Sequence, residues 1–241
     1  MPMPLLEVCV GDPESLDAAV AGGADRIELC SALEIGGLTP TPGLMALAAA
    51  APVPVYAMVR PRGGGFVFSQ AERRAMLADI AAIRAAGLSG VVLGASRPDG
   101  TLDRDTLADL VGASAGLGLT LHRAFDLVPA IEPAVDLAVD LGFERILTSG
   151  RAVAAMDGLA DLARAHALAD GRLAIMAGSD LSADNVAALL ARVPLGEVHG
   201  SCSATIGPDD ANAQRLGFGG SRRRTDAGEV RRMKAALGSS G

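Results

Sequence analysis

The chain has 241 residues, half of them hydrophobic, and a formal net charge of −7 at pH 7. That length suits a single (β/α) barrel and does not require two domains. The negative charge argues against nucleic acid or an anionic membrane as a partner, because phosphate groups attract cationic surfaces. We therefore expect neither partner, and we expect the basic run Arg222–Arg224 to be a solvated loop.

The N-terminal segment lacks the cationic and apolar regions of a secretory signal, and no apolar run approaches the ~20 residues of a membrane-spanning helix. Three cysteines scattered over a chain with a large core do not form a disulfide framework. These features predict a cytoplasmic protein with reduced thiols. The last residues, 238–241, are expected to be a flexible tail.

Apolar strands and Ala/Leu-rich helices are predicted to alternate along the chain. The predicted strands lie near 5–10, 25–30, 53–60, 90–95, 117–123, 144–149, 172–177 and 196–201. The predicted helices lie near 13–22, 42–51, 69–86, 103–115, 129–141, 152–169, 182–192 and 226–237. This alternation predicts an α/β protein, a (β/α)8 TIM barrel over about 5–203 in a single domain, with a doubly wound open sheet as the alternative.

Several predicted helices begin with N-cap chemistry. Asp12 precedes Pro13, Thr41 precedes a proline, and Ser69 begins a capping box with a glutamate three residues later. Ser182 is a further candidate cap.

Alternation within the strands places ionisable side chains inside the barrel. In the first strand Leu6, Val8 and Val10 should face the helices, so Glu7 and Cys9 face inward. The same rule places these further polar side chains inside: Glu28, Cys30, Arg60, His122, Glu197 and His199. Each unpaired buried charge costs several kcal/mol, so these groups should pair with one another or with a ligand.

Arg60 and Arg62 flank a proline and precede a glycine run, 63–65, at the end of the third strand. Guanidinium groups bind carboxylate or phosphate bidentately, which makes both arginines candidate ligand-binding residues. The alternative is that Arg60 only neutralises Glu7 or Glu28.

The segment His122–Asp126 follows the fifth strand and combines three kinds of chemistry. His122 is a candidate base or metal ligand, Arg123 a candidate anion clamp, and Asp126 a candidate orienting carboxylate. A second histidine, His199, also falls at a strand end.

Ser149 and Gly150 follow the sixth strand and could donate hydroxyl and amide hydrogen bonds to a ligand. The loop 177–182 after the seventh strand lies where barrels often bind phosphate. Because Asp180 puts a negative charge there, this loop is expected to be an ordinary connection with a helix cap.

Cys9 and Cys30 are expected at matching inward positions on adjacent strands, about 4.8 Å apart. Such a thiolate pair would suit Cu(I), whereas the alternative is that both cysteines pack as small core residues. Cys202 could join a site at the end of the eighth strand.

Seven ordered motifs carry a family resemblance. They are Glu7–Val10, Gly23–Cys30, Gly36–Pro40, Arg60–Gly64, His122–Asp126, Leu147–Gly150 and Glu197–His199. Together they resemble the CutC family, named for copper homeostasis, over about 5–203. The resemblance implies a cytoplasmic TIM barrel that forms homo-oligomers and binds copper (Cu+) through cysteines, for which Cys9 and Cys30 are the matching positions.

The chain departs from the family pattern at four positions. Ile35 stands where a glutamate is usual, Gly65 and Phe68 stand where aspartate and tyrosine are usual, and Cys202 replaces an alanine. These departures put in doubt any activity that needs the missing carboxylates and phenol.

Three functions remain open from the sequence. The first is copper homeostasis with Cu(I) bound by the paired cysteines. The second is a lyase or isomerase acting on a small anionic metabolite, held by Arg60, Arg62 and Arg123, with His122, His199, Glu7 or Glu28 as acid, base or metal ligand. The third is a scaffold without catalysis.

Overall fold

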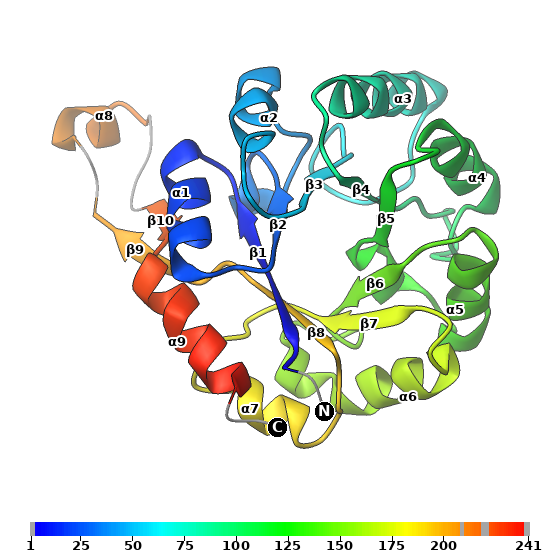
Figure 1. Ribbon diagram of the computed structural model, residues 1–241. Coiled ribbons are helices and arrows are strands. Elements are labelled where there is room, and N and C mark those ends of the chain that lie inside the picture. The colour runs from blue at the N-terminus through cyan, green and yellow to red at the C-terminus, as the bar shows by residue number, and fades with distance from the viewer. Residues whose placement is uncertain (1–2, 208–209, 218–221, 239–241) are drawn as a thin grey trace.

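The computed structural model describes residues 3–207, 210–217 and 222–238, and its centre is a closed barrel of parallel strands (Figure 1). The strands in order are β1 (Leu5–Val10), β2 (Arg26–Leu29), β3 (Val55–Met58), β4 (Gly90–Leu93), β5 (Gly118–Leu121), β6 (Arg145–Thr148), β7 (Ala174–Ala177) and β8 (Glu197–Gly200). β8 pairs with β1, so the barrel has no free edge. The predicted TIM barrel is confirmed.

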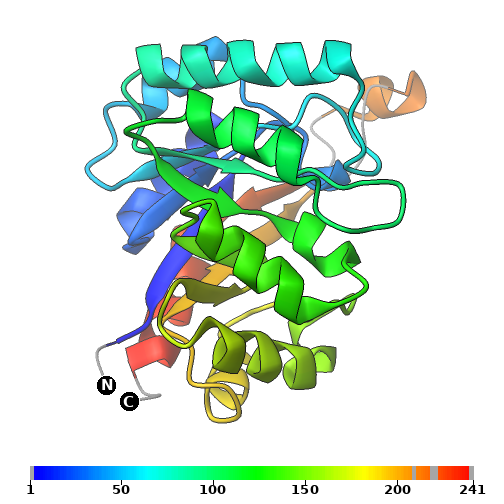
Figure 2. The same cartoon turned by 90° about the vertical axis from the view of Figure 1, so that its right-hand side faces the viewer.

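Helices surround the strands, as Figure 2 shows from the side. They are α1 (Pro13–Gly22), α2 (Pro42–Ala48), α3 (Gln70–Ala85), α4 (Arg104–Ala113), α5 (Ile131–Asp140), α6 (Leu159–Ala169), α7 (Val186–Leu190) and α9 (Ala227–Gly238). Short 3₁₀ turns lie at η1 (Leu33–Ile35), η2 (Arg123–Leu127) and η3 (Ala155–Asp157). The caps predicted at Asp12, Thr41 and Ser69 are confirmed, because each side chain accepts a hydrogen bond from a backbone amide of the first helical turn.

Two predicted helices are shorter than expected. α7 begins only at Val186, because Ser182 and Asn185 hydrogen-bond within the preceding turn instead of capping a longer helix. The predicted helix over 152–169 begins only at Leu159, after Gly158, whose backbone packs closely against Gly150.

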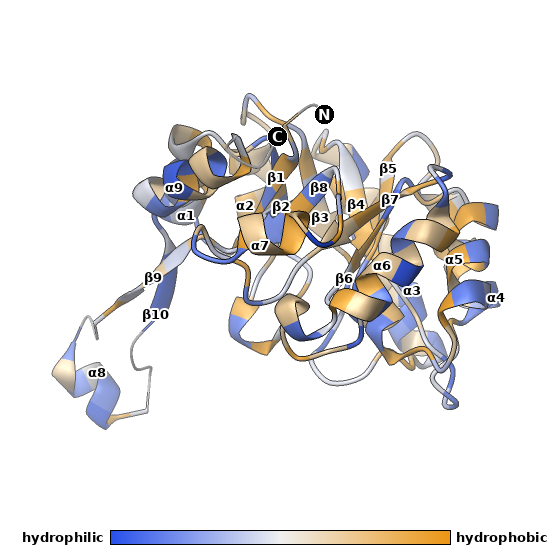
Figure 3. Ribbon diagram, turned by 90° about the horizontal axis from the view of Figure 1, so that it is seen from below, coloured by the Kyte–Doolittle hydropathy of each residue, from blue (hydrophilic) through white to orange (hydrophobic). Residues whose placement is uncertain are grey.

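The segment after the barrel contains an arm that the sequence did not indicate. β9 (Ser203–Ile206) pairs antiparallel with β10 (Arg222–Thr225), and α8 (Ala211–Arg215) lies beyond them, projecting away from the barrel (Figure 3). The expected solvated loop at Arg222–Arg224 is therefore wrong: the arginines are exposed but belong to a strand. Gly238 ends α9, and the remaining predicted tail residues, 239–241, lie outside the described residues.

Side chains separate by face as alternation requires. Leu6, Val8 and Val10 are fully buried in the apolar layer between strands and helices. Inside the barrel the ring of Tyr56 lies over two strand glycines, and a Cβ on Gly118 would lie only 2.1 Å from the Tyr56 hydroxyl oxygen. The interior therefore needs glycine there to admit the barrel's aromatic side chain.

Candidate functional site

A cavity of about 470 Å³ opens at the carboxyl ends of the strands. Its lining includes Cys9, Glu28, Met58, Arg60, Phe66, His122, Arg123, Leu147, Ser179, Asp180, His199, Cys202 and Arg223. This volume falls in the range of small-molecule sites, and the carboxyl end is where TIM barrels place them.

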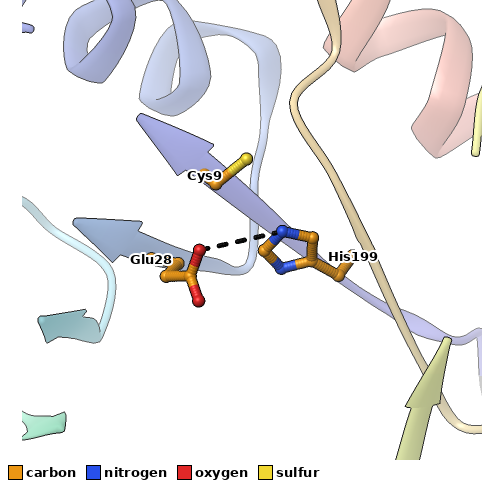
Figure 4. A group of neighbouring side chains, drawn as sticks. All are labelled: Cys9, Glu28 and His199. Atoms are coloured by element: carbon orange, nitrogen blue, oxygen red, sulfur yellow. Dashed lines mark ion pairs between the residues drawn. The ribbon is translucent and has the colours of Figure 1, made fainter. Parts of the chain in front are cut away.

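Cys9, Glu28 and His199 point toward one another from the neighbouring strands β1, β2 and β8 (Figure 4). One potential ligand atom from each residue lies within 4.8 Å of the other two, and all three side chains are buried. The strand pairing explains this, because Cys9 lies opposite Glu28 while its neighbour Glu7 lies opposite His199. We refer to these three residues as the triad.

The predicted register of the two cysteines is wrong. β1 and β2 pair so that Cys9 faces Glu28, which places Cys30 two residues farther along the barrel. The Cys30 thiol donates to Glu28 Oε2 at 3.5 Å and packs with Tyr56 and Met58. Burial, together with the Glu28 carboxylate, raises the pKa of this thiol well above its usual range. Cys30 is thus not a member of the triad, and it is not among the residues lining the cavity.

Glu7 orients the triad histidine from below. Its Oε1 lies 2.8 Å from His199 Nδ1, and its Oε2 accepts from Arg26 Nε at 2.5 Å. Burial alone would raise the pKa of Glu7, but the His199 hydrogen bond and the Arg26 charge lower it to about 2. An ionised Glu7 accepts a hydrogen bond from Nδ1–H, so Nε2 is turned toward Glu28 Oε2, 3.8 Å away.

The groups around His199 favour its protonated form. Burial lowers its pKa, but the Cys9 sulfur and the carboxylates of Glu28 and Glu7 raise it well above its usual range. Burial raises the pKa of Glu28, whose Oε1 is buried without a hydrogen-bond partner. A metal ion would displace protons from this group, which is the usual coupling of metal binding to protonation.

A charge network fills the barrel beneath the triad. Arg26 bridges Glu7 and Glu197, and Arg145 pairs with Glu197 at 3.1 Å and with Glu144 at 2.9 Å. The expectation that interior charges pair is confirmed for these groups. Neither arginine was predicted to lie inside, although alternation from Glu28 places Arg26 on the inward face.

Arg60 neutralises neither Glu7 nor Glu28. Its Nη1 donates to the carbonyls of Ile35 and Gly37 at 3.0 Å each, its Nη2 donates to the Gly64 carbonyl at 2.6 Å, and its Nε has no partner. The alternative that this arginine only balances an interior carboxylate is therefore wrong.

His122 is buried beside the same cavity. Its Nδ1 accepts from the Ala124 amide at 3.1 Å, and its Nε2 is buried without a partner. Burial and the charge of Arg60 lower the pKa of His122 to about 3, so the ring is neutral. Asp126 does not orient this ring as predicted, because the backbone of Ala124 holds it.

Asp126 instead ties the loop after β5 to the loop after β6. Its carboxylate accepts from Thr148 Oγ1 at 2.5 Å, from the amides of Ser149 and Arg151, and from Arg123 Nε at 2.7 Å. The donors predicted to hold a ligand at this loop thus already have an internal carboxylate partner.

Two other predicted ligand residues, and Arg123 again, are engaged in loop contacts. Gly150 N–H donates to Thr148 Oγ1 at 2.9 Å. Arg62 pairs with Glu72 and is not among the residues lining the cavity. Arg123 does line the cavity, but its Nη2 also donates to Ser149 Oγ at 2.8 Å.

Two further lining residues bear on the chemistry of the cavity. Phe66, which was not predicted from the sequence, contacts both Arg60 and His122. Cys202, a departure from the family pattern, also lines the cavity, and burial raises its pKa to about 12.

The barrel and the triad define a TIM-barrel protein with a candidate metal centre at the carboxyl ends of its strands. The chain belongs to the CutC family, whose model matches residues 4–204. It is 57% identical over 233 residues to a CutC family protein of Rhizobium meliloti (strain 1021), covering 96% of this chain and 95% of that protein. The crystal structure titled "Putative Copper Homeostasis Protein CutC" from Streptococcus agalactiae is 30% identical and superposes with a TM-score of 0.79, covering 83% of this chain and 99% of that one.

Within the described residues, none of the helices combines the length and apolar character required to cross a membrane.

Proposed function

We propose that this CutC-family barrel binds one transition-metal ion at the triad. The observation that carries the proposal is the convergence of a thiol, a carboxylate and an imidazole within 4.8 Å, all buried. Glu7 behind His199 supports it, because ligating histidines usually donate their other ring N–H to a carboxylate.

The donor set points to the kind of ion. Sulfur, nitrogen and oxygen together suit borderline ions such as Zn²⁺ or Cu²⁺, whereas Cu(I) prefers sulfur ligands alone. Three protein ligands beside a cavity also match the open coordination of catalytic zinc sites. Copper remains the first ion to test, because copper homeostasis stands in the name of the Streptococcus agalactiae relative.

Cysteine variants separate this site from the Cu(I) pair expected from the family. We expect Cys9→Ala to weaken Zn²⁺ or Cu²⁺ binding by about 100-fold or more, measured by competition with a chelator after metal removal. Cys30→Ala should leave the affinity unchanged, and Cys202→Ala is the matched control with a thiol lost from the same cavity. Equal losses in Cys9→Ala and Cys30→Ala, seen with Cu(I), would instead support the cysteine pair.

The cavity favours a second function, a metal-assisted lyase or isomerase acting on a small anionic metabolite. A bound ion supplies polarisation of a substrate oxygen. Glu28, whose pKa burial raises, is positioned to exchange a proton with a molecule in the cavity, and Arg60 brings a buried positive charge to the same space. Metal-loaded protein incubated with mixed small carboxylic acids and sugar phosphates should convert one of them, as followed by proton NMR, and Glu28→Gln should abolish the conversion.

A cytoplasmic location and a homo-oligomeric state complete the proposal. Both are expected from the family resemblance. Cell fractionation and sedimentation velocity would check them.

A further inference from the structure

Arg60 carries a buried positive charge that only neutral groups contact. Arg60 is only 5% exposed, and its three side-chain hydrogen bonds all go to backbone carbonyls. Among the described residues, no carboxylate forms an ion pair with it. Carbonyls orient a guanidinium but leave its charge uncompensated, which is costly at a buried site. The three bonds occupy three of its five N–H donors, leaving Nε–H and one on Nη2.

His122 offers a second donor to the same cavity. Because its Nδ1 accepts from the Ala124 amide, the proton of the neutral ring resides on Nε2. His122 is only 3% exposed, and its buried Nε2–H has no hydrogen-bond acceptor. A buried donor without a partner is costly, so its acceptor is expected to come from a ligand.

Phe66 contacts both donor residues. Its ring centroid lies 5.0 Å from the Arg60 guanidinium carbon and 4.7 Å from the His122 ring centroid. All three residues line the cavity that also contains the triad. An aromatic ring, a cation and an N–H donor thus lie next to one another in the lining of the cavity.

We propose that Arg60 and His122 form a carboxylate-binding subsite, so that the ligand of this cavity is a small carboxylic acid with a second oxygen function directed at the triad. The inference deepens the enzymatic function proposed above and rests on it for the substrate's role. A carboxylate matches the subsite because it carries one negative charge and two oxygens, which suit one guanidinium and one further donor. The same cavity is lined by Glu28 and Asp180 as well as by Arg123 and Arg223, so phosphate is the competing anion in the test.

Glycolate is the probe for this subsite, titrated by calorimetry into metal-free protein. Glycolamide, which has the same shape without the charge, is the matched control ligand. We expect saturable binding of glycolate and none of glycolamide. The proposal is overturned if neither glycolate nor acetate binds saturably with a Kd below about 100 mM. Tighter binding of inorganic phosphate than of glycolate at the same residues overturns the carboxylate assignment.

Two variants test the residues. Arg60→Lys keeps a positive charge but removes the paired guanidinium N–H donors. It should weaken the affinity for glycolate at least about 10-fold. His122→Asn keeps an acceptor for the Ala124 amide while removing Nε2–H, and should weaken glycolate about 10-fold with the fold intact. Unchanged glycolate affinity in a folded His122→Asn variant overturns the subsite.

A third variant separates this inference from the metal proposal. Cys9→Ala removes a triad ligand but leaves Arg60 and His122 in place, so glycolate binding to metal-free protein should persist. If the protein binds metal but not glycolate, the carboxylate-subsite proposal fails and the metal-site proposal stands. Glycolate binding without metal binding defeats the metal centre alone.

Discussion

His122 should make the stability of the protein depend on pH in a predictable direction. Burial, with the charge of Arg60 adding to it and Asp126 opposing it, lowers the pKa of His122 from 6.5 to about 3 in the folded protein. Between pH 6.5 and about 3, His122 therefore binds a proton in the unfolded chain but not in the folded protein. The free energy of unfolding is therefore unaffected by this residue above pH 6.5 and decreases progressively as the pH falls from 6.5 toward 3.

The size of the effect follows from the pKa difference. Each pH unit in this window costs about 1.4 kcal/mol, so lowering the pH from about 7 to about 5 should cost about 2 kcal/mol through this residue. The assay is urea unfolding of the wild type and of His122→Asn at both pH values. The variant keeps the contact to Ala124 without a titrating group, and other residues cancel in the comparison. Equal pH dependence in the two proteins would refute the reasoning.

Three other changes should act at separate points of the barrel. Glu7→Gln should lower metal affinity about 10- to 100-fold, because a neutral amide no longer holds the triad histidine as a carboxylate does; unchanged affinity by chelator competition would contradict this. Asp126→Asn should lower the free energy of unfolding by about 2 to 3 kcal/mol by disrupting hydrogen bonds between two loops, with glycolate affinity unchanged. Gly118→Ala should destabilise by at least about 1–3 kcal/mol because its Cβ meets the Tyr56 hydroxyl, whereas Gly112→Ala, with open space around it, serves as the control in the same urea assay.

Strand and helix positions could be predicted because their signals are local. Buried parallel strands are apolar runs between helix ends, and caps such as Asp12 and Ser69 mark where helices begin. The strand at Arg222–Thr225 was not predicted, because an exposed two-stranded arm is held together by backbone pairing, which needs no apolar pattern in the sequence.

The interior residues of the site could also be predicted, but not their partners. Cys9, Glu28, Arg60, His122 and His199 all line the cavity, as the alternation of the strands indicated. Their pairing depends on how far each strand is staggered against the next. A shift of two residues keeps the same face inward while changing every neighbour, so no facing rule could detect it.

The sequence by itself determined the barrel and which side chains enter it, since both follow from periodicities along one segment. Only the tertiary structure decided that Cys9 meets Glu28 and His199 and that Cys30 is not part of this group. It also decided that interior carboxylates pair with Arg26 and Arg145, leaving Arg60 without one. These contacts join strands distant in the chain, and the stagger of the closed barrel sets them.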